Sequence, residues 1–145
     1  MTRHCLFAGV LGLLAFSAPA LADAPAGRYT FPASGTVYDT RTKLTWQRVA
    51  DGNEYTQSAA ASYCASLSLA GTGWRLPSAD ELLTLIDPTR YNPAVDPAFS
   101  SSSGNPFWSS TPYAGSSDRG WTVYFLEGSS SFYLTSSKCL VRCVR

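Results

Sequence analysis

The most informative segment of the chain reads Trp74-Arg75-Leu76-Pro77-Ser78-Ala79-Asp80-Glu81-Leu82. Pro77 disfavours helical backbone at the residue before it, so the chain should reach Ser78 in an extended conformation. Ser78 can then cap a helix, with Glu81 reaching back to the cap from three residues further on. The segment therefore predicts an extended arm that leads directly into a helix.

The helix that begins at Ser78 should be short and buried on one side. Leu82, Leu85 and Ile86 fall on one face at helical spacing. Asp87-Pro88 should end the helix, because proline cannot continue it.

A second helix is expected earlier in the chain, from Gln57 to Leu69. Thr56 can cap it, and Gly71 stands just past its end. Cys64 shares a face with the apolar residues of this helix, so its side chain should point into the core.

A hairpin should precede both helices. Val37 and then Leu44 with Trp46 place apolar side chains at strand spacing, and residues 39–43 supply a polar turn.

The second half of the chain should be richer in strands. Residues 92–106 are dense in Ser, Pro, Gly and Asn and predict a long irregular loop. Three strands should follow, over residues 120–126, 131–135 and 139–144, with Glu127-Gly128-Ser129 as a hairpin turn between the first two.

The N-terminus reads as an export signal over residues 1–22. A basic start, an apolar run over 6–16 and the small residues Ala20-Leu21-Ala22 form the usual three-part pattern. The apolar run is too short to span a bilayer, so no membrane insertion is expected after cleavage. The mature chain should then comprise a short leader, residues 23–34, and a single domain, residues 35–145, in the periplasm or outside the cell.

Charge and histidine content exclude several functions. Eleven basic and ten acidic residues give a net charge of +1, and removal of Arg3 with the signal leaves a formally neutral chain, which is unlike a nucleic-acid-binding protein. His4 is the only histidine and would also be removed. Serine or cysteine nucleophiles activated by histidine and histidine metal sites are therefore excluded. No catalytic residue, metal or cofactor is expected.

Four segments in this order resemble the Legionella collagen-like protein (Lcl) C-terminal domain family, a bacterial extracytoplasmic domain. The segments are 35–47, 74–82, 107–111 and 141–145. The resemblance runs over residues 35–145 and implies an α+β, C-type-lectin-like fold related to sulfatase-modifying factors. Such a fold packs two short helices on a mostly antiparallel twisted sheet with long irregular loops. The structural residues of the motifs are Trp46, Trp74, Arg75, Leu76, Pro77, Glu81 and Trp108.

Three cysteines remain once Cys5 leaves with the signal: Cys64, Cys139 and Cys143. In an oxidising compartment, one disulfide and one odd thiol is the simplest arrangement. Cys139 and Cys143 would lie about 13 Å apart on a strand, too far to bond. The resemblance implies a disulfide between Cys64 and Cys143. Cys139 is then a buried small hydrophobe, a reactive thiol or the link of a disulfide-bonded dimer.

The calcium chemistry of lectins cannot be carried over to this chain. Trp108-Ser109-Ser110 lies where calcium-dependent lectins have Trp-Asn-Asp, and the preceding loop has neither Glu-Pro-Asn nor Gln-Pro-Asp. Trp108 is therefore expected in the core, as are Trp46 and Trp74.

The better candidate for a ligand-binding rim is the segment 111–121. Tyr113, Asp118 and Arg119 offer an aromatic ring, a carboxylate and a guanidinium among small flexible residues. The alternative is an ordinary solvated connection between two strands.

The function expected from these features is an exported, non-catalytic binding module. Its loops, 92–106 and 113–119, would contact a glycan, a surface polymer or a protein without calcium. One alternative is a structural subunit of a surface assembly. The other is a cysteine-dependent oxidase related to formylglycine-generating enzymes, for which Cys139 and Cys143 are the candidates.

Overall fold

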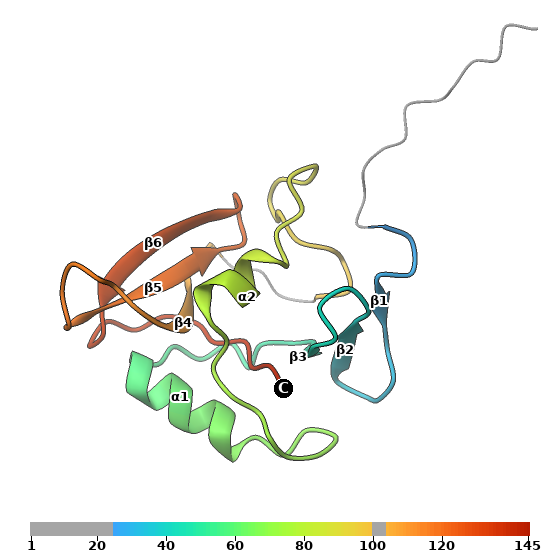
Figure 1. The fold of residues 1–145 in the computed structure, drawn as a ribbon, viewed down its shortest axis with the longest axis horizontal. Coiled ribbons are helices and arrows are strands. Elements are labelled where there is room, and N and C mark those ends of the chain that lie inside the picture. Colours follow the sequence, from blue (N-terminus) through green and yellow to red (C-terminus); the bar gives the residue numbers. More distant parts are fainter. Residues whose placement is uncertain (1–24, 100–103) are drawn as a thin grey trace, which may run out of the picture.

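The computed structural model describes residues 25–99 and 104–145, so the expected signal over residues 1–22 lies outside the described part. The described chain is α+β, with two helices and two three-stranded antiparallel sheets (Figure 1). The predicted class and the two short helices are confirmed, whereas the expectation of one sheet is wrong. The elements are β1 Tyr29–Thr30, β2 Thr36–Asp39, β3 Thr45–Gln47, α1 Gln57–Ser66, α2 Ala79–Leu83, β4 Phe107–Pro112, β5 Arg119–Tyr124 and β6 Ser129–Leu134.

The first sheet has the order β1-β2-β3 and contains the predicted hairpin. Val37 on β2 pairs with Trp46 on β3, and both side chains are completely buried. The sheet also takes in part of the leader, because Tyr29 on β1 pairs with Asp39 on β2. A segment that shows little pattern in the sequence is thus part of the folded structure.

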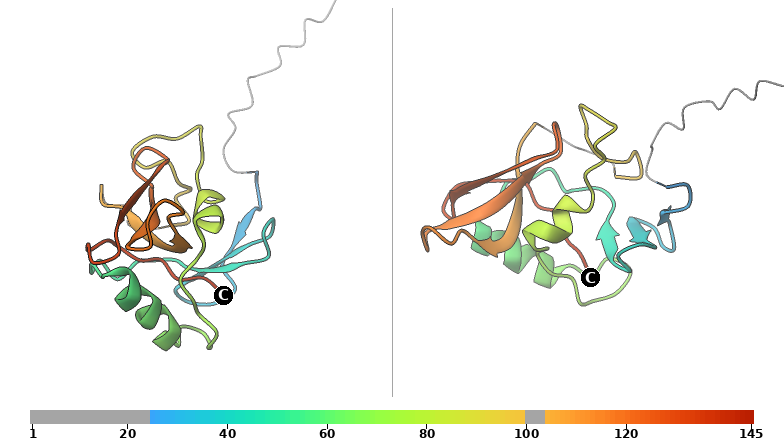
Figure 2. Two further views of the ribbon diagram at one scale, coloured as in Figure 1. Left: turned by 60° about the vertical axis from the view of Figure 1, so that its left-hand side comes forward. Right: turned by 45° about the horizontal axis from the view of Figure 1, so that its top comes forward.

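The second sheet has the order β4-β5-β6 and lies at the other end of the molecule (Figure 2). Trp121 on β5 lies opposite Phe132 on β6. The turn between these strands covers residues 125–128 and ends at Gly128, whose φ of 78° suits glycine. The turn therefore begins two residues before the predicted Glu127-Gly128-Ser129.

The predicted strand over residues 139–144 is wrong. This segment runs through the middle of the molecule to the C-terminus and forms isolated bridges instead of a ladder (Figure 1). Its bridging partners belong to four different parts of the chain, so no single neighbouring strand runs alongside it. The bridges are Cys139 with Tyr55, Leu140 with Phe107, and Val144 with both Trp46 and Arg75.

Helix α1 begins where the sequence predicts and ends earlier. The Ala59 N–H donates to Thr56 Oγ1 at 3.3 Å, which confirms the cap. The helix stops at Ser66 rather than Leu69, because Leu67 has extended backbone. Cys64 is completely buried, as expected.

Helix α2 carries the predicted capping box. The Glu81 N–H donates to Ser78 Oγ at 3.1 Å, and the Ser78 N–H donates to Glu81 Oε2 at 2.8 Å. The helix ends at Leu83 rather than at Asp87, since Leu85 and Ile86 already donate to carbonyls three residues back. Leu82 and Leu85 are buried as predicted.

Two clusters of buried side chains form the core, and the predicted core tryptophans are confirmed. Trp46 belongs to one cluster, and Trp74 and Trp108 to the other. The indole of Trp108 donates to the Tyr55 carbonyl at 2.7 Å, so its polar atom is satisfied. Val95 and Phe99 are also buried, so the described part of the 92–106 loop packs into the core. No helix in the described part is long and apolar enough to cross a membrane.

Candidate functional site

The arm and helix at residues 74–83 support the second sheet. Arg75 and Glu81 form an ion pair, and this guanidinium lowers the pKa of the Glu81 carboxyl below its ordinary value. The arm is joined to β4, since the Ser110 N–H donates to the Pro77 carbonyl at 2.7 Å. Thr111 Oγ1 accepts from the Ala79 N–H at 2.9 Å. The capping segment therefore positions one face of the sheet that carries the predicted rim.

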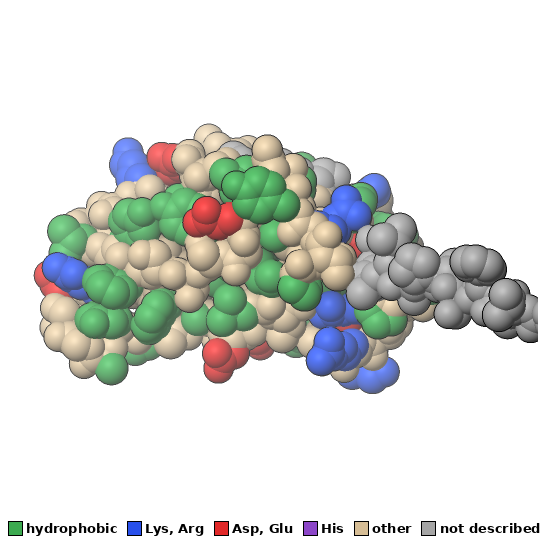
Figure 3. Space-filling model, turned by 90° about the horizontal axis from the view of Figure 1, so that it is seen from above, with side chains coloured by type: hydrophobic (Ala, Val, Ile, Leu, Met, Phe, Trp, Pro, Cys, Tyr) green, Lys and Arg blue, Asp and Glu red, His purple; other side chains and the backbone are tan. Residues whose placement is uncertain are grey.

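Three aromatic rings gather on that sheet, and we call Tyr113, Trp121 and Phe132 the aromatic patch. Tyr113 stacks on Phe132 with ring centroids 4.1 Å apart, and Trp121 meets Tyr113 edge-on at 5.7 Å. The Arg119 guanidinium carbon lies 5.4 Å from the centre of the Phe132 ring, within cation–π range. All three rings are partly exposed. The view from above shows hydrophobic side chains gathered over the end of the molecule that holds β5 and β6 (Figure 3).

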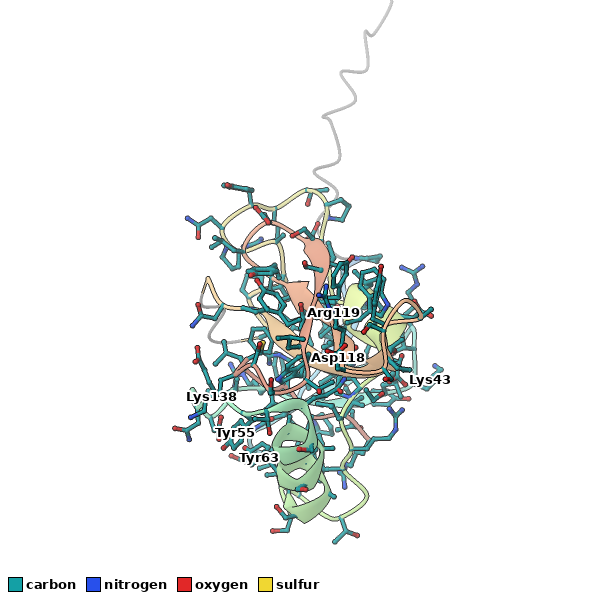
Figure 4. All side chains as sticks on the ribbon, turned by 90° about the vertical axis from the view of Figure 1, so that its left-hand side faces the viewer. Lys43, Tyr55, Tyr63, Asp118, Arg119 and Lys138 are labelled. Carbon is teal, nitrogen blue, oxygen red and sulfur yellow. A yellow bond between two sulfur atoms is a disulfide. The ribbon has the colours of Figure 1, made fainter. Side chains whose placement is uncertain are left out.

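The structure brings the three predicted rim residues to one end of the sheet. The Tyr113 N–H donates to the Arg119 carbonyl at 2.9 Å, which closes the connection between β4 and β5. Asp118 and Arg119 are exposed, and the Asp118 carboxylate accepts from the Ser116 hydroxyl. Figure 4 shows both residues on the side of the molecule that also presents α1. Their role in binding stays a prediction.

Sequence reasoning missed two members of the patch, Trp121 and Phe132. Trp121 ends the segment 111–121 that predicts the rim but is not among its named binding residues, and Phe132 falls in the predicted strand 131–135 with no binding role assigned. The available signal was the strand pairing, because a hairpin with its turn at residues 125–128 places these two residues directly opposite each other.

The patch continues into a small pocket of about 200 Å³ between α2 and β5. Trp121 forms one wall, and Leu83, which is 38% exposed, forms another. Asp80 lines the same pocket from the first turn of α2. A ligand on the patch would therefore meet both apolar surface and a carboxylate.

A larger groove of about 650 Å³ lies between α1 and the second sheet, and we call it the hydroxyl groove. Its polar lining consists of Thr56, Gln57, Ser58, Ser110, Thr135 and Ser136, and its apolar lining of Ala61 and Leu76.

Gln57 connects α1 to the sheet at this groove. Its Nε2 donates to the Ser109 carbonyl at 2.8 Å, and its backbone N–H donates to the Thr135 carbonyl at 3.0 Å. A Cβ on Gly120 would lie 2.2 Å from Gln57 Nε2, so only glycine allows this approach without a shift of the amide.

The predicted disulfide between Cys64 and Cys143 is present and ties α1 to the C-terminal segment. Cys139 is a free thiol, 1% exposed, and burial raises its pKa to about 12. Of the three alternatives for Cys139, the structure agrees with the first, in which the side chain is a small buried hydrophobic group. A disulfide-linked dimer or a reactive thiol would require this residue to become exposed.

Metal-ligating side chains do not cluster in the described ranges 25–99 and 104–145, where no group of three or more His, Cys, Asp or Glu could hold an ion. The segment Trp108-Ser109-Ser110, compared above with the calcium motif of lectins, packs into the core at its first two residues. Trp108 and Ser109 are completely buried, and Ser109 Oγ donates to the Trp121 carbonyl at 2.7 Å.

Comparison with known proteins identifies one family. The family model described as the Lcl C-terminal domain matches residues 35–145. No curated protein matches the chain.

Proposed function

Because the chain belongs to the Lcl C-terminal domain family, we propose that it is an exported binding module that holds an external ligand on the aromatic patch. The module acts outside the cytoplasm, on a C-type-lectin-like scaffold, and needs neither catalysis nor calcium. Its ligand is a component of a surface, such as a glycan, a polymer or a protein.

The observation that carries this proposal is the partly exposed contact of Tyr113, Trp121 and Phe132 with Arg119 beside them. Tyrosine, tryptophan and arginine are the side chains most often found to dominate binding energy at interfaces. Aromatic rings also offer large contact area at a low cost in conformational entropy. Trp121 and Phe132 lie on paired strands, so part of this surface is already ordered before a ligand arrives.

The cysteines support a non-catalytic role. The oxidase alternative uses Cys139 and Cys143 as a pair, but Cys143 is bonded to Cys64. The remaining thiol is buried and its pKa is raised to about 12, so little thiolate is present at neutral pH.

The test starts from a ligand found by screening glycan arrays and bacterial and host cell surfaces with the mature protein. Tyr113→Ala, Trp121→Ala and Arg119→Ala should each weaken binding by about 1 kcal/mol or more, roughly fivefold. Tyr91→Ala is the matched control, because Tyr91 is 75% exposed and lies outside the patch. A chelator should leave the affinity unchanged.

Two results would contradict the proposal. Loss of binding in chelator would show that a metal ion is needed. Undiminished binding by all three patch variants, measured on samples with native circular dichroism spectra, would remove the patch as the binding surface.

The alternative of a structural subunit is favoured by one feature, the edge strand β6. It lies at the margin of its sheet, and its residues Ser129–Leu134 include no charged residue and no proline, the usual protections of an exposed edge. Assembly through β6 should appear as a concentration-dependent rise in mass by sedimentation. Ser130→Pro, at a position of β6 whose N–H faces away from β5, should abolish it.

A further inference from the structure

The hydroxyl groove differs in chemistry from the aromatic patch. None of its lining residues is charged, and five of the eight carry a hydroxyl: Thr56, Ser58, Ser110, Thr135 and Ser136. Each hydroxyl can both donate and accept a hydrogen bond, and the Gln57 amide also offers both functions. With no charged partner in the lining, an ionic ligand would lose its hydration shell there without compensation.

The groove also has an apolar component. Leu76 of the arm, which is 5% exposed, lines the groove, and Ala61 contributes a methyl group from α1. An apolar surface bordered by neutral hydroxyls matches a sugar ring, which presents C–H groups on its faces and hydroxyls around its rim. The volume of about 650 Å³ lies within the range of about 300–1,000 Å³ that small-molecule sites occupy.

The walls of the groove are held in place from both sides. On the sheet side, the Ser110 N–H donates to Pro77, and the Thr135 N–H donates to the Asp118 carbonyl at 2.8 Å. On the helix side, Gln57 is bonded to both Ser109 and Thr135. A groove whose walls are ordered in the free protein loses little conformational entropy when it binds.

From this lining we infer that the hydroxyl groove is a second binding site, for a short stretch of an uncharged saccharide. It is separate from the aromatic patch, because Gln57 approaches β5 at Gly120, whereas the neighbouring Trp121 points to the other face of the sheet. The groove proposal is thus independent of the proposed function, and either can be correct when the other is wrong.

The test is a calorimetric and NMR titration of the mature protein with maltopentaose, cellopentaose, mannopentaose, xylopentaose and chitopentaose, with pentagalacturonic acid as the anionic comparison. At least one neutral oligosaccharide should bind, and pentagalacturonic acid should not. The shifted amide signals should belong to groove residues such as Ser58, Ala61 and Ser136, and the Trp121 indole signal should stay in place.

Two variants locate the site. Ala61→Trp fills the groove from an exposed helix position and should weaken binding by about tenfold or more, whereas Ala65→Trp makes the same change at another exposed position of α1 that does not line it. Thr135→Val keeps the shape and removes one hydroxyl, so it should weaken binding by about threefold to tenfold. The patch variant Tyr113→Ala should bind these oligosaccharides normally.

Three results would overturn the inference: no binding of any neutral oligosaccharide, binding that survives Ala61→Trp, or a preference for pentagalacturonic acid. Loss of oligosaccharide binding in Tyr113→Ala but not in Ala61→Trp would also overturn it, and would assign saccharide binding to the patch instead.

Discussion

Arg75 and Glu81 are joined at two points: Nη1 of Arg75 donates to Oε2 of Glu81 at 2.7 Å, and Nη2 donates to Oε1 at 2.6 Å. The same carboxylate accepts the Ser78 N–H, so it closes the helix cap and holds the arm that precedes the helix. One side chain, Glu81, therefore both completes the capping box and helps to hold α2 in its place against β4 and β5.

Replacing Glu81 should separate these two roles. Glu81→Gln keeps a side chain that can complete the cap and loses the ion pair, which should cost about 1 kcal/mol because Arg75 is half exposed. Glu81→Ala loses both and should cost about 2 kcal/mol. Urea unfolding at pH 7 measures both values. Equal costs for the two variants would show that the cap contributes nothing.

The contribution of Glu81 should depend on pH. Its pKa is lowered in the folded protein, first by the hydrogen bonds from Arg75, so the stabilisation is complete above the ordinary value of 4.5. It is lost as the pH falls through the lowered pKa. Thermal melts at pH 7 and pH 3 should therefore show a smaller difference between the wild type and Glu81→Gln at pH 3. A difference that grows on acidification would contradict this assignment.

The disulfide should be a major source of stability. It closes a loop over a sequence separation of 79 residues, for which the chain-entropy model gives about 4 kcal/mol. Cys64→Ser and Cys143→Ser should each lower the free energy of unfolding by about 2–5 kcal/mol. Cys139→Ala is the matched control and should cost about 1 kcal/mol, since it removes only a buried thiol. If Cys139→Ala is as harmful as the other two, the thiol has a further structural partner.

The Cys139 thiol should be unreactive in the native protein. Its burial and raised pKa leave almost no thiolate within reach of a reagent. Iodoacetamide at pH 8 should label it only after unfolding, as followed by intact mass. Rapid labelling of the native protein, or a dimer band on a non-reducing gel, would instead indicate that Cys139 becomes accessible.

The leader should be needed for full stability. Arg28 donates to Asp39 Oδ2 at 2.7 Å and to Oδ1 at 3.1 Å, and both side chains are buried. Burial opposes the charged form of Asp39, but the hydrogen bond from Arg28 and its neighbours outweigh this effect and lower the pKa of that carboxyl. Asp39→Asn keeps the shape and leaves the buried guanidinium without its counter-ion, which should cost about 3–5 kcal/mol.

The exposed Asp80 supplies the control for this change. Asp80→Asn should alter stability by about 0.5 kcal/mol or less. Chemical denaturation at neutral pH measures the free energy of unfolding of both variants. A cost for Asp39→Asn no greater than that of the control would mean that the leader contributes little to the fold.

The features that the sequence predicted correctly depend on residues close together in the chain. The cap at Thr56, the capping box of Ser78 and Glu81, and the hairpin around residues 39–43 each follow from contacts over a few positions. The burial of the tryptophans was also predictable from the sequence, because exposing a large apolar side chain to water costs the most free energy.

The features that only the tertiary structure decided are those that depend on residues far apart in the chain. Residues 139–144 have strand-like composition, but their neighbours come from four different segments, so they form bridges and no strand. Arg142 lies in this segment with its guanidinium buried, donating to the carbonyls of Gln47 and Arg48. Burial lowers the pKa of Arg142 to about 10. Nothing local to an arginine near the end of a chain indicates such a position.

The candidate sites show the same division. Local sequence marked Tyr113, Asp118 and Arg119 as a rim, but only strand pairing brings Trp121 and Phe132 beside them. The hydroxyl groove takes its lining from α1, the arm, β4 and the residues after β6. Caps and turns form from interactions within one stretch of backbone, whereas a patch or a groove exists only after the packing of remote segments has fixed which side chains meet.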